Sequence, residues 1–446
     1  MRRRSSTRLE SGLRSCCWEY SLMIGLAVAK RAEEARSIAE SIAAAQRYRL
    51  TRPHRLIEIE TAMGFACVAA REGEILEKSD RLIACAHYPP LDESRLERLL
   101  ESEDHVRSLR GLDQFFSGVI IDRESIMLFR DHVGHMPVGY AKTAKALTAA
   151  LSRSALGPAA KPLEPGHMLI LNSSGSRIIR WYDPAPWAMS SPEELAERLM
   201  STAEKYLPEQ VFLGFSGGLD SSILAHLAAL LGRRVKGITV AMKGSLDYLW
   251  ARETADLLGI ELEILEPDDA ELAEAASLLL SHLPRAGLMD LSIGSIVLLA
   301  ARRARGMLVV GQGADELFGG YWRYEKAVLE GGIEAAAELM KRDVERIHER
   351  NLERDELAAA LAGSQVLAPY VAKSIYETAL SIDPGLKLRI LDGRVIRKWI
   401  LRRAAEILGI PVGILEKPKK AAQYSSGIQK RLGKILAEKK MGLRIV

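Results

Sequence analysis

Cysteine is scarce in this sequence, and its four positions do not form a metal-binding or disulfide pattern. They are Cys16, Cys17, Cys67 and Cys85, and no pair has CxxC spacing or lies near clustered histidines. Cys67 and Cys85 lie within apolar runs, so we expect small buried core residues there rather than reactive thiols. This usage excludes a disulfide-rich secreted framework and favours a reducing cytoplasm.

Long apolar runs and a strong excess of one charge are also missing. No stretch of about 18 uncharged apolar residues occurs, so we expect no membrane-spanning helix and no membrane partner. The net charge is only +4, and Lys and Arg are not clustered as in a dedicated nucleic-acid-binding protein. Hydrophobic residues at 48% and charged residues at 27% are typical of a folded globular chain.

The length and the pattern along the chain predict two domains. At 446 residues the chain is too long for one core, which usually stops growing near about 250 residues. Residues 1–22 are Arg-rich without apolar periodicity, which indicates a disordered arm or a start codon misassigned upstream of Met23. Strand-length apolar stretches fill 23–185 and predict a sheet-rich first domain.

A Pro- and Ser-rich linker at 183–194 separates the two patterns. From residue 192, helices and strands alternate, beginning with a helix at 192–206 and a strand at 211–215. This alternation predicts βαβ units and a parallel sheet, with a mostly helical chain after Tyr321.

The strongest functional signal is the stretch VFLGFSGGLDSSILAHLA at 211–228. An apolar strand runs into a glycine turn, and a helix follows at once. The residues at this junction are Ser216, Gly217, Gly218, Asp220, Ser221 and Ser222. Glycines allow close backbone approach, and free N–H groups at a helix start favour an anion. Asp220 would repel a bare phosphate, which suggests that it holds a Mg²⁺ ion bridging phosphate oxygens. No GK[ST] follows, so this is not a Walker loop.

These residues resemble the SGGLDS loop of the PP-loop ATP pyrophosphatases, which split ATP between the α and β phosphates. Residues 309–324, VVGQGADELFGGYWRY, are similar to the SGEGADELFGGY signature of the asparagine synthetase family. By this resemblance Asp315 and Glu316 offer carboxylate oxygens to Mg²⁺, while Gly311 and Gly313 let the backbone approach the substrate. Gln312 stands where many members have Glu, and the missing charge puts a role as base in doubt.

Two further segments extend the resemblance. Residues 238–265 are similar to the part that contacts adenosine, where backbone groups at Val240 would face adenine; alone, the segment is an ordinary βαβ element. Residues 397–427 resemble the family's lysine segment, whose lysine stabilises the departing pyrophosphate. Pro418–Lys419 matches the family's PK or QK pair, so Lys419 is the expected residue and Lys420 the alternative.

The first half resembles the family's glutaminase half. Residues 115–140 look like its RDxxGxxP stretch, which implies an α+β sandwich of N-terminal nucleophile hydrolase type. The second half, 192–446, then implies a parallel-sheet, PP-loop α/β domain with a helical C-terminal part. Family glutaminases begin MCGI, whereas Met23 is followed here by Ile24, which cannot attack a carbonyl. We therefore expect an inactive glutaminase-like domain at 23–185, unless processing exposes Cys16 or Cys17.

The resemblance implies a cytoplasmic ligase that uses ATP and Mg²⁺ to adenylate and amidate aspartate or another small carboxylate. Ammonia would come from solution or from a separate glutaminase, and a homodimer is compatible with this reading. One alternative is another adenylating amide-bond former, of the β-lactam synthetase or cyclase type. A non-catalytic nucleotide-binding protein would be expected to lose Asp220, Asp315 or Lys419. An RNA-modifying enzyme would need a basic or aromatic surface that the sequence does not indicate.

Overall fold

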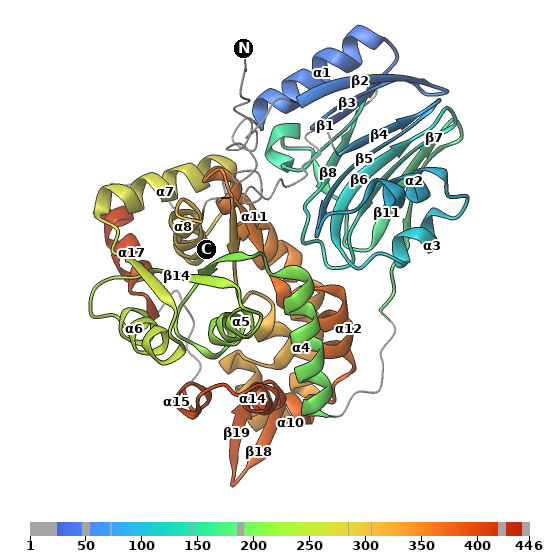
Figure 1. The fold of residues 1–446 in the computed structure, drawn as a ribbon. Helices are drawn as coiled ribbons and strands as arrows, with labels where there is room; N and C mark the ends of the chain where they lie inside the picture. The colour runs from blue at the N-terminus through green and yellow to red at the C-terminus, as the bar shows by residue number, and fades with distance from the viewer. Residues whose placement is uncertain are drawn as a thin grey trace, which may run out of the picture.

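The protein is seen in a computed structural model as two bodies, each built around β-sheet (Figure 1). The described residues are 25–46, 54–71, 74–143, 146–184, 191–283, 285–304, 306–417 and 425–438. The expected N-terminal arm, Ile24, part of the linker, Lys419 and Lys420 lie outside these residues. The fold is α/β, as predicted, with antiparallel sheets first and a parallel sheet second.

The first body, the β-sandwich, pairs two six-stranded antiparallel sheets with the orders β10-β8-β9-β1-β3-β2 and β12-β11-β7-β6-β5-β4. The strands are β1 (Gly25–Ala29), β2 (His54–Thr61), β3 (Gly64–Arg71), β4 (Ile75–Lys78), β5 (Arg81–Tyr88), β6 (Phe115–Ile121), β7 (Ser125–Arg130), β8 (Gly139–Lys142), β9 (Ala146–Ala150), β10 (Lys161–Pro162), β11 (His167–Asn172) and β12 (Gly175–Arg180). Helix α1 (Ala32–Ala45) lies on the first sheet, and α2 (Glu93–Glu101) and α3 (His105–Arg110) lie beside the second.

Alternation along the strands explains this layering. In β1, Leu26 and Val28 pack between the sheets, whereas Ala27 and Ala29 pack under α1 with Cys67. Successive side chains of a strand point to opposite faces, so a strand buried on both faces reads as a continuous apolar run. Cys67 and Cys85 are both buried, as expected for core residues, and burial raises the pKa of the Cys67 thiol to about 11.

The second body, the C-terminal α/β part, contains a five-stranded parallel sheet with the order β15-β14-β13-β16-β17. Its strands are β13 (Gln210–Gly214), β14 (Arg234–Val240), β15 (Glu261–Leu265), β16 (Met307–Val309) and β17 (Gln365–Leu367). Its helices of nine or more residues are α4 (Pro192–Tyr206), α5 (Leu219–Leu230), α6 (Leu246–Leu258), α7 (Asp269–His282), α8 (Leu288–Ala301), α10 (Trp322–Glu345), α11 (Glu353–Leu361), α12 (Lys373–Ser381), α14 (Trp399–Ile407) and α17 (Ile428–Glu438).

Helices cover both faces of this sheet. Val211 and Leu213 of β13 pack with α4, α5 and α14, whereas Ile238 and Val240 of β14 pack with α7, α8 and α17. Both faces are therefore buried, as parallel sheets require. The predicted helix at 192–206 and the predicted strands agree with the structure to within a few residues.

Two strand elements were not expected after Tyr321. Strand β17 joins the edge of the sheet beside β16, and β18 (Leu388–Leu391) and β19 (Arg394–Arg397) form a hairpin at the bottom of Figure 1. Both elements have only three or four residues per strand, which is too short for a periodic signal in the sequence.

A turn at 131–137 folds one edge of the β-sandwich. The Asp131 carboxylate accepts backbone N–H groups from Val133, Gly134 and His135 at 3.0, 2.6 and 3.0 Å, and one from Met136 at 2.8 Å. A carboxylate that accepts several N–H groups fixes the backbone around it. The RDxxGxxP stretch thus has a structural role that needs no nucleophile.

The same turn joins the two bodies. His132 donates from Nε2 to the carbonyl oxygen of Val371 at 2.9 Å, and Nε2 of His135 accepts the N–H of Ala368 at 3.2 Å. Arg130, fully buried, donates to the carbonyl oxygens of Gly134, Met136 and Leu163 at 2.7 to 3.1 Å, and its guanidinium lies 3.2 Å from the Glu353 carboxylate.

His135 gives this interface an expected dependence on pH. Burial lowers the pKa of its imidazole from 6.5 to about 4, so the folded state resists protonation there. The resulting stability is present above pH 6.5 and is lost as the pH falls through about 4. We expect His135→Gln, whose amide oxygen can still accept the Ala368 N–H, to reduce this acid loss by about 2–3 kcal/mol in urea unfolding. His54→Gln on β2 is the control, and an unchanged pH profile in His135→Gln would contradict the prediction.

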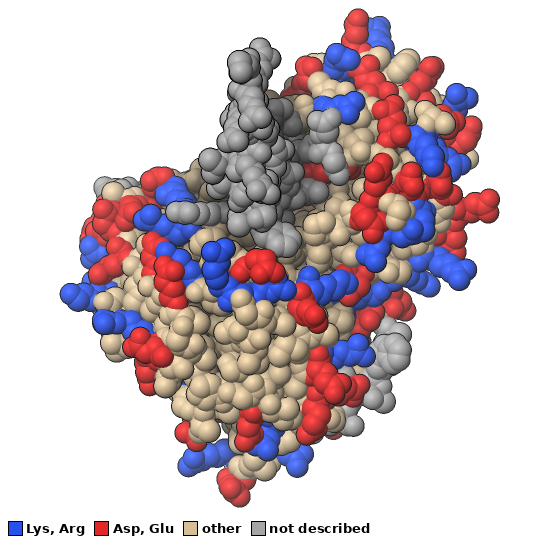
Figure 2. Space-filling view, viewed as in Figure 1, with Lys and Arg blue, Asp and Glu red and all other residues tan. Residues whose placement is uncertain are grey.

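On the face drawn in Figure 2, the described Lys and Arg side chains alternate with Asp and Glu rather than gathering by sign. Among the described residues, no helix is both long and apolar enough to cross a membrane.

Candidate active site

The junction between β13 and α5 forms a tight loop that only glycine can make. Gly217 has φ +68°, and a Cβ there would lie 2.4 Å from the Trp250 carbonyl oxygen. Gly218 begins α5 without a side-chain cap, so the N–H groups of the first turn face outward at the positive end of the helix. This arrangement is suited to a phosphate group.

The serines of the loop brace its backbone. Ser221 and Ser222 donate their hydroxyls to the Gly218 carbonyl oxygen at 3.3 and 2.8 Å, and Ser216 Oγ accepts the Gly218 N–H at 3.4 Å. As arranged, these hydroxyls hold the shape of the loop, and backbone N–H groups would supply most contacts to phosphate.

Asp220 and Asp315 converge on one buried cation. Lys398 Nζ lies 2.6 Å from Oδ1 of Asp220 and 2.6 Å from Oδ1 of Asp315, and its side chain is 1% exposed. Asp220 lies in the first turn of α5, and Asp315 in the first turn of α9 (Ala314–Phe318). The two predicted metal ligands, 95 positions apart in sequence, are thus brought together by the sheet.

The glycines of the second motif allow this approach. A Cβ at Gly311 would lie 3.0 Å from Asp220 Cβ, and one at Gly313, where φ is +91°, would lie 2.3 Å from Val371 Cγ1. A Cβ at Gly320 would lie 1.9 Å from Asp315 Oδ1 and 2.2 Å from Lys398 Cε. Side chains at these positions would push the carboxylates and the lysine apart.

Lys398 was missed by the sequence reasoning, although it lies in the 397–427 segment that drew attention to Lys419. It precedes α14 in the left-handed region, with φ +56°. A lysine with this backbone conformation is uncommon, but the sequence gives no sign of it. The pairing with Asp220 and Asp315 depends on tertiary structure alone.

Glu316 is buried beside this cluster. Its Oε1 accepts the Tyr321 hydroxyl and the Asn351 side-chain N–H, both at 2.5 Å. Burial, followed by the nearby charge of Asp315, raises the pKa of the Glu316 carboxyl to about 7. The carboxyl is therefore poised to exchange a proton near neutral pH, whereas Gln312, which lines the same cavity, cannot.

A cavity of about 1430 Å³ contains these groups. Its lining includes Asp220, Val240, Gln312 and Glu316, and it extends to Arg153 of the β-sandwich. Pockets for one small ligand commonly measure about 300–1000 Å³, so this volume has room for a nucleotide and a second substrate together. Val240 ends β14 on the cavity wall, where the resemblance places adenine.

The predicted lysines 419 and 420 cannot be placed, because 418–424 lie outside the described residues. The residues that flank this segment are anchored near α6. Lys417 Nζ lies 2.6 Å from Thr254 Oγ1 and 3.0 Å from the Glu253 carboxylate, and the Ser426 carbonyl oxygen accepts the Met242 N–H at 2.9 Å.

Comparisons with known proteins agree with the motifs. A family model described as asparagine synthase matches residues 208–335 and 329–441. A putative glutamine-hydrolysing asparagine synthetase of Methanocaldococcus jannaschii is 29% identical over 73% of this chain and 72% of its own. The glutamine-hydrolysing asparagine synthetase 2 of Oryza sativa subsp. japonica is 28% identical over 71% of this chain, and the match covers only 58% of its length.

Solved structures are less similar. The NMN synthetase of Francisella tularensis has a TM-score of 0.30 at 15% identity, covering 57% of this chain and 98% of its own. The allosteric regulatory enzyme of purine biosynthesis also has a TM-score of 0.30 at 15% identity, covering 55% of this chain and 68% of its own. Likeness at this level supports no statement about activity. The family model, by contrast, matches more than half of the chain, and the chain therefore belongs to the asparagine synthase family.

Proposed function

We propose that this protein is an ATP-dependent ligase that adenylates the side-chain carboxylate of aspartate and amidates it with ammonia. The observation that carries the proposal is the convergence of Asp220, Asp315 and Lys398 beside the phosphate-type loop of α5, where both aspartates line one large cavity. We propose that residues 192–446 form the synthetase domain.

The charges of this cluster fit a Mg²⁺ ion brought in with ATP. Asp220, Asp315 and Lys398 together carry one net negative charge, which would repel a polyphosphate. A divalent ion held by Asp220 and Asp315 would reverse that sign, and Mg²⁺ is commonly bound by one or two carboxylates plus substrate phosphates. When bound, the ion would supply charge neutralisation on the phosphate oxygens.

The groups that these residues would bind suggest the course of the reaction. The N–H groups of Gly217 and Gly218 and of the first turn of α5 would bind phosphate oxygens, and the backbone at Val240 would bind adenine. A carboxylate oxygen of aspartate attacks the α-phosphorus of ATP, the bond from that phosphorus to the bridging oxygen breaks, and pyrophosphate leaves. The positive charges of Lys398 and Lys419 would stabilise the departing pyrophosphate. Ammonia then attacks the acyl carbon, and AMP departs.

The nitrogen would come from ammonia, either from solution or from a separate glutaminase. The sequence places Ile24 where the family nucleophile would stand, so we propose that 23–185 is a glutaminase-like domain without glutaminase activity. We further propose that the protein is cytoplasmic. A homodimer would be compatible with this function.

Gln312 favours a second candidate. A neutral amide replaces the carboxylate that many family members carry, so the acyl substrate would differ if that carboxylate served as base. The second candidate is an adenylating amide-bond former of the β-lactam synthetase or cyclase type. In either case Glu316, whose pKa burial raises to about 7, could accept a proton in this cavity.

The test is pyrophosphate release by the purified protein with ATP, Mg²⁺ and aspartate, comparing ammonium with glutamine. We expect ammonium to support asparagine formation and glutamine to give less than about a hundredth of that rate, since the nucleophile is missing. Equal asparagine formation with glutamine would contradict the proposal that the glutaminase-like domain is inactive. Pyrophosphate release that does not depend on aspartate would favour the second candidate function.

A further inference from the structure

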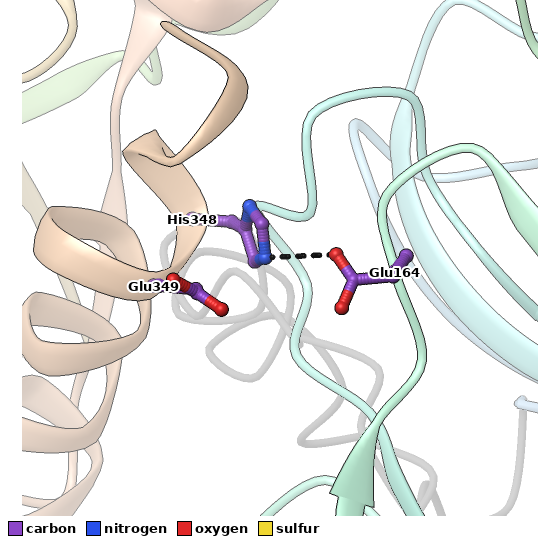
Figure 3. Close-up of side chains that lie close together, drawn as sticks. All are labelled: Glu164, His348 and Glu349. Carbon is purple, nitrogen blue, oxygen red and sulfur yellow. Dashed lines mark ion pairs between the residues drawn. The ribbon is translucent and has the colours of Figure 1, made fainter. Parts of the chain in front are cut away.

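Three side chains able to bind a metal ion meet where the two bodies touch, and one of them, Glu349, also lines the large cavity. Glu164 lies between β10 and β11, and His348 and Glu349 begin the π-helix η3 (His348–Leu352). One ligand atom from each lies within 4.8 Å of the others. Figure 3 shows the imidazole of His348 directed toward Glu164, with Glu349 beside it.

His348 is buried without a hydrogen bond. Its side chain is 4% exposed, neither ring nitrogen makes a hydrogen bond, and Nε2 lies 3.3 Å from Glu164 Oε2. An imidazole nitrogen without a hydrogen-bond partner, aimed at a carboxylate, is a position from which histidine can bind a metal ion.

The buried imidazole of His348 and the Glu164 carboxylate lie close together but form no hydrogen bond. A polar group buried without a hydrogen bond is costly, and a cation between Nε2 and the Glu164 oxygen would satisfy both atoms. Glu164 and Glu349 both face the cluster, and Arg346 pairs with Glu349 at 3.3 Å, so these two carboxylates bring more negative charge than that one arginine offsets. Both glutamates are about half exposed, so they can close around an ion without moving the backbone.

The donor set selects the kind of ion. An imidazole nitrogen with two carboxylates suits Zn²⁺ and its neighbours, whereas Mg²⁺ and Ca²⁺ prefer oxygen ligands throughout. Three protein ligands at a half-exposed site leave a coordination position for water.

We propose that Glu164, His348 and Glu349 bind one divalent transition-metal ion of the Zn²⁺ class, which ties the β-sandwich to η3. The site is separate from the proposed Mg²⁺ ligands and does not rest on the proposed reaction. It also borders the cavity, because Glu349 and Asn351 of η3 both line it and Asn351 donates to Glu316. A π-helical turn of this kind is often found at functional sites.

The test uses the full-length protein after removal of metal with a chelator. Titration with Co²⁺ should give one bound equivalent with d–d absorption and without the charge-transfer band of a thiolate, which separates this site from the cysteines. Zn²⁺ should displace Co²⁺ and raise the Tm, whereas excess Mg²⁺ should do neither. We expect His348→Gln and the double variant Glu164→Gln/Glu349→Gln each to weaken Co²⁺ binding by more than roughly tenfold. Changing a residue that only hydrogen-bonds to a metal ligand already weakens binding about tenfold, so changing the ligand itself should cost more.

Glu338→Gln is the matched control, because this glutamate is similarly exposed on α10 and pairs with Arg342. It should bind Co²⁺ as the wild type does. The double variant changes only half-exposed side chains, so it remains informative if His348→Gln fails to fold. Co²⁺ binding by both ligand variants as tight as that of the wild type, a thiolate band as the only signal, or no bound equivalent in the wild type would overturn the proposal.

Discussion

Replacing Asp315 with asparagine is expected to slow ATP-dependent pyrophosphate release by about 1000-fold, which corresponds to about 4 kcal/mol of transition-state stabilisation. The change keeps the size of the side chain but removes one of the two charges that converge on Lys398. Without that charge, the pair of carboxylates proposed to hold Mg²⁺ is reduced to Asp220 alone. Initial rates at saturating ATP and Mg²⁺ measure the effect.

Asp256→Asn, an exposed position near the end of α6, is the control and should keep the wild-type rate. The urea midpoint of both variants should stay close to that of the wild type, which separates lost chemistry from lost folding. If Asp315→Asn keeps more than about a tenth of the rate, this carboxylate is not a ligand required for catalysis.

The second large effect is expected for stability, from Arg130→Met. Arg130 is fully buried, donates to three backbone carbonyl oxygens and pairs with Glu353. Its removal leaves those oxygens without donors and weakens the pairing of a carboxylate that is only 13% exposed. Breaking a buried pair from one side costs about 3–5 kcal/mol, which equilibrium urea unfolding would measure.

Arg153→Met is a matched control for this change. Arg153 pairs with the same Glu353 carboxylate at 2.6 Å, but its side chain is 44% exposed. An exposed ion pair is worth less than about 1 kcal/mol, so the two arginines should differ several-fold in cost. Equal losses would mean that the carbonyl contacts of Arg130 contribute little.

Much of the fold could be predicted from periodicity. The strand-length runs of the β-sandwich and the alternating units from α4 to β16 occur where the apolar pattern places them, because each is long enough to repeat its period. The glycine loop before α5 could also be predicted from the sequence, since only glycine fits the turn at Gly217. Strand β17 and the β18–β19 hairpin were not predicted, because strands of three or four residues are too short to show an apolar period.

The site was predictable only in part. Motif spacing located Asp220 and Asp315, but their meeting at Lys398 depends on three segments far apart in sequence. The proton-exchanging character of Glu316 arises from burial and from Asp315, and neither can be read from a glutamate in a motif. The assigned roles of Gln312, Val240 and Lys419 remain predictions.

The order of synthesis has a consequence for the turn at 131–137. Its two partners, Ala368 and Val371, lie more than 230 residues later in the chain, directly after β17, the last strand of the parallel sheet. Chains emerge from the ribosome N-terminus first, and domains generally fold as units during synthesis. The β-sandwich is therefore complete well before its partners, and the apolar surface around Phe115 and Tyr88 stays uncovered while the chain is extended as far as residue 371.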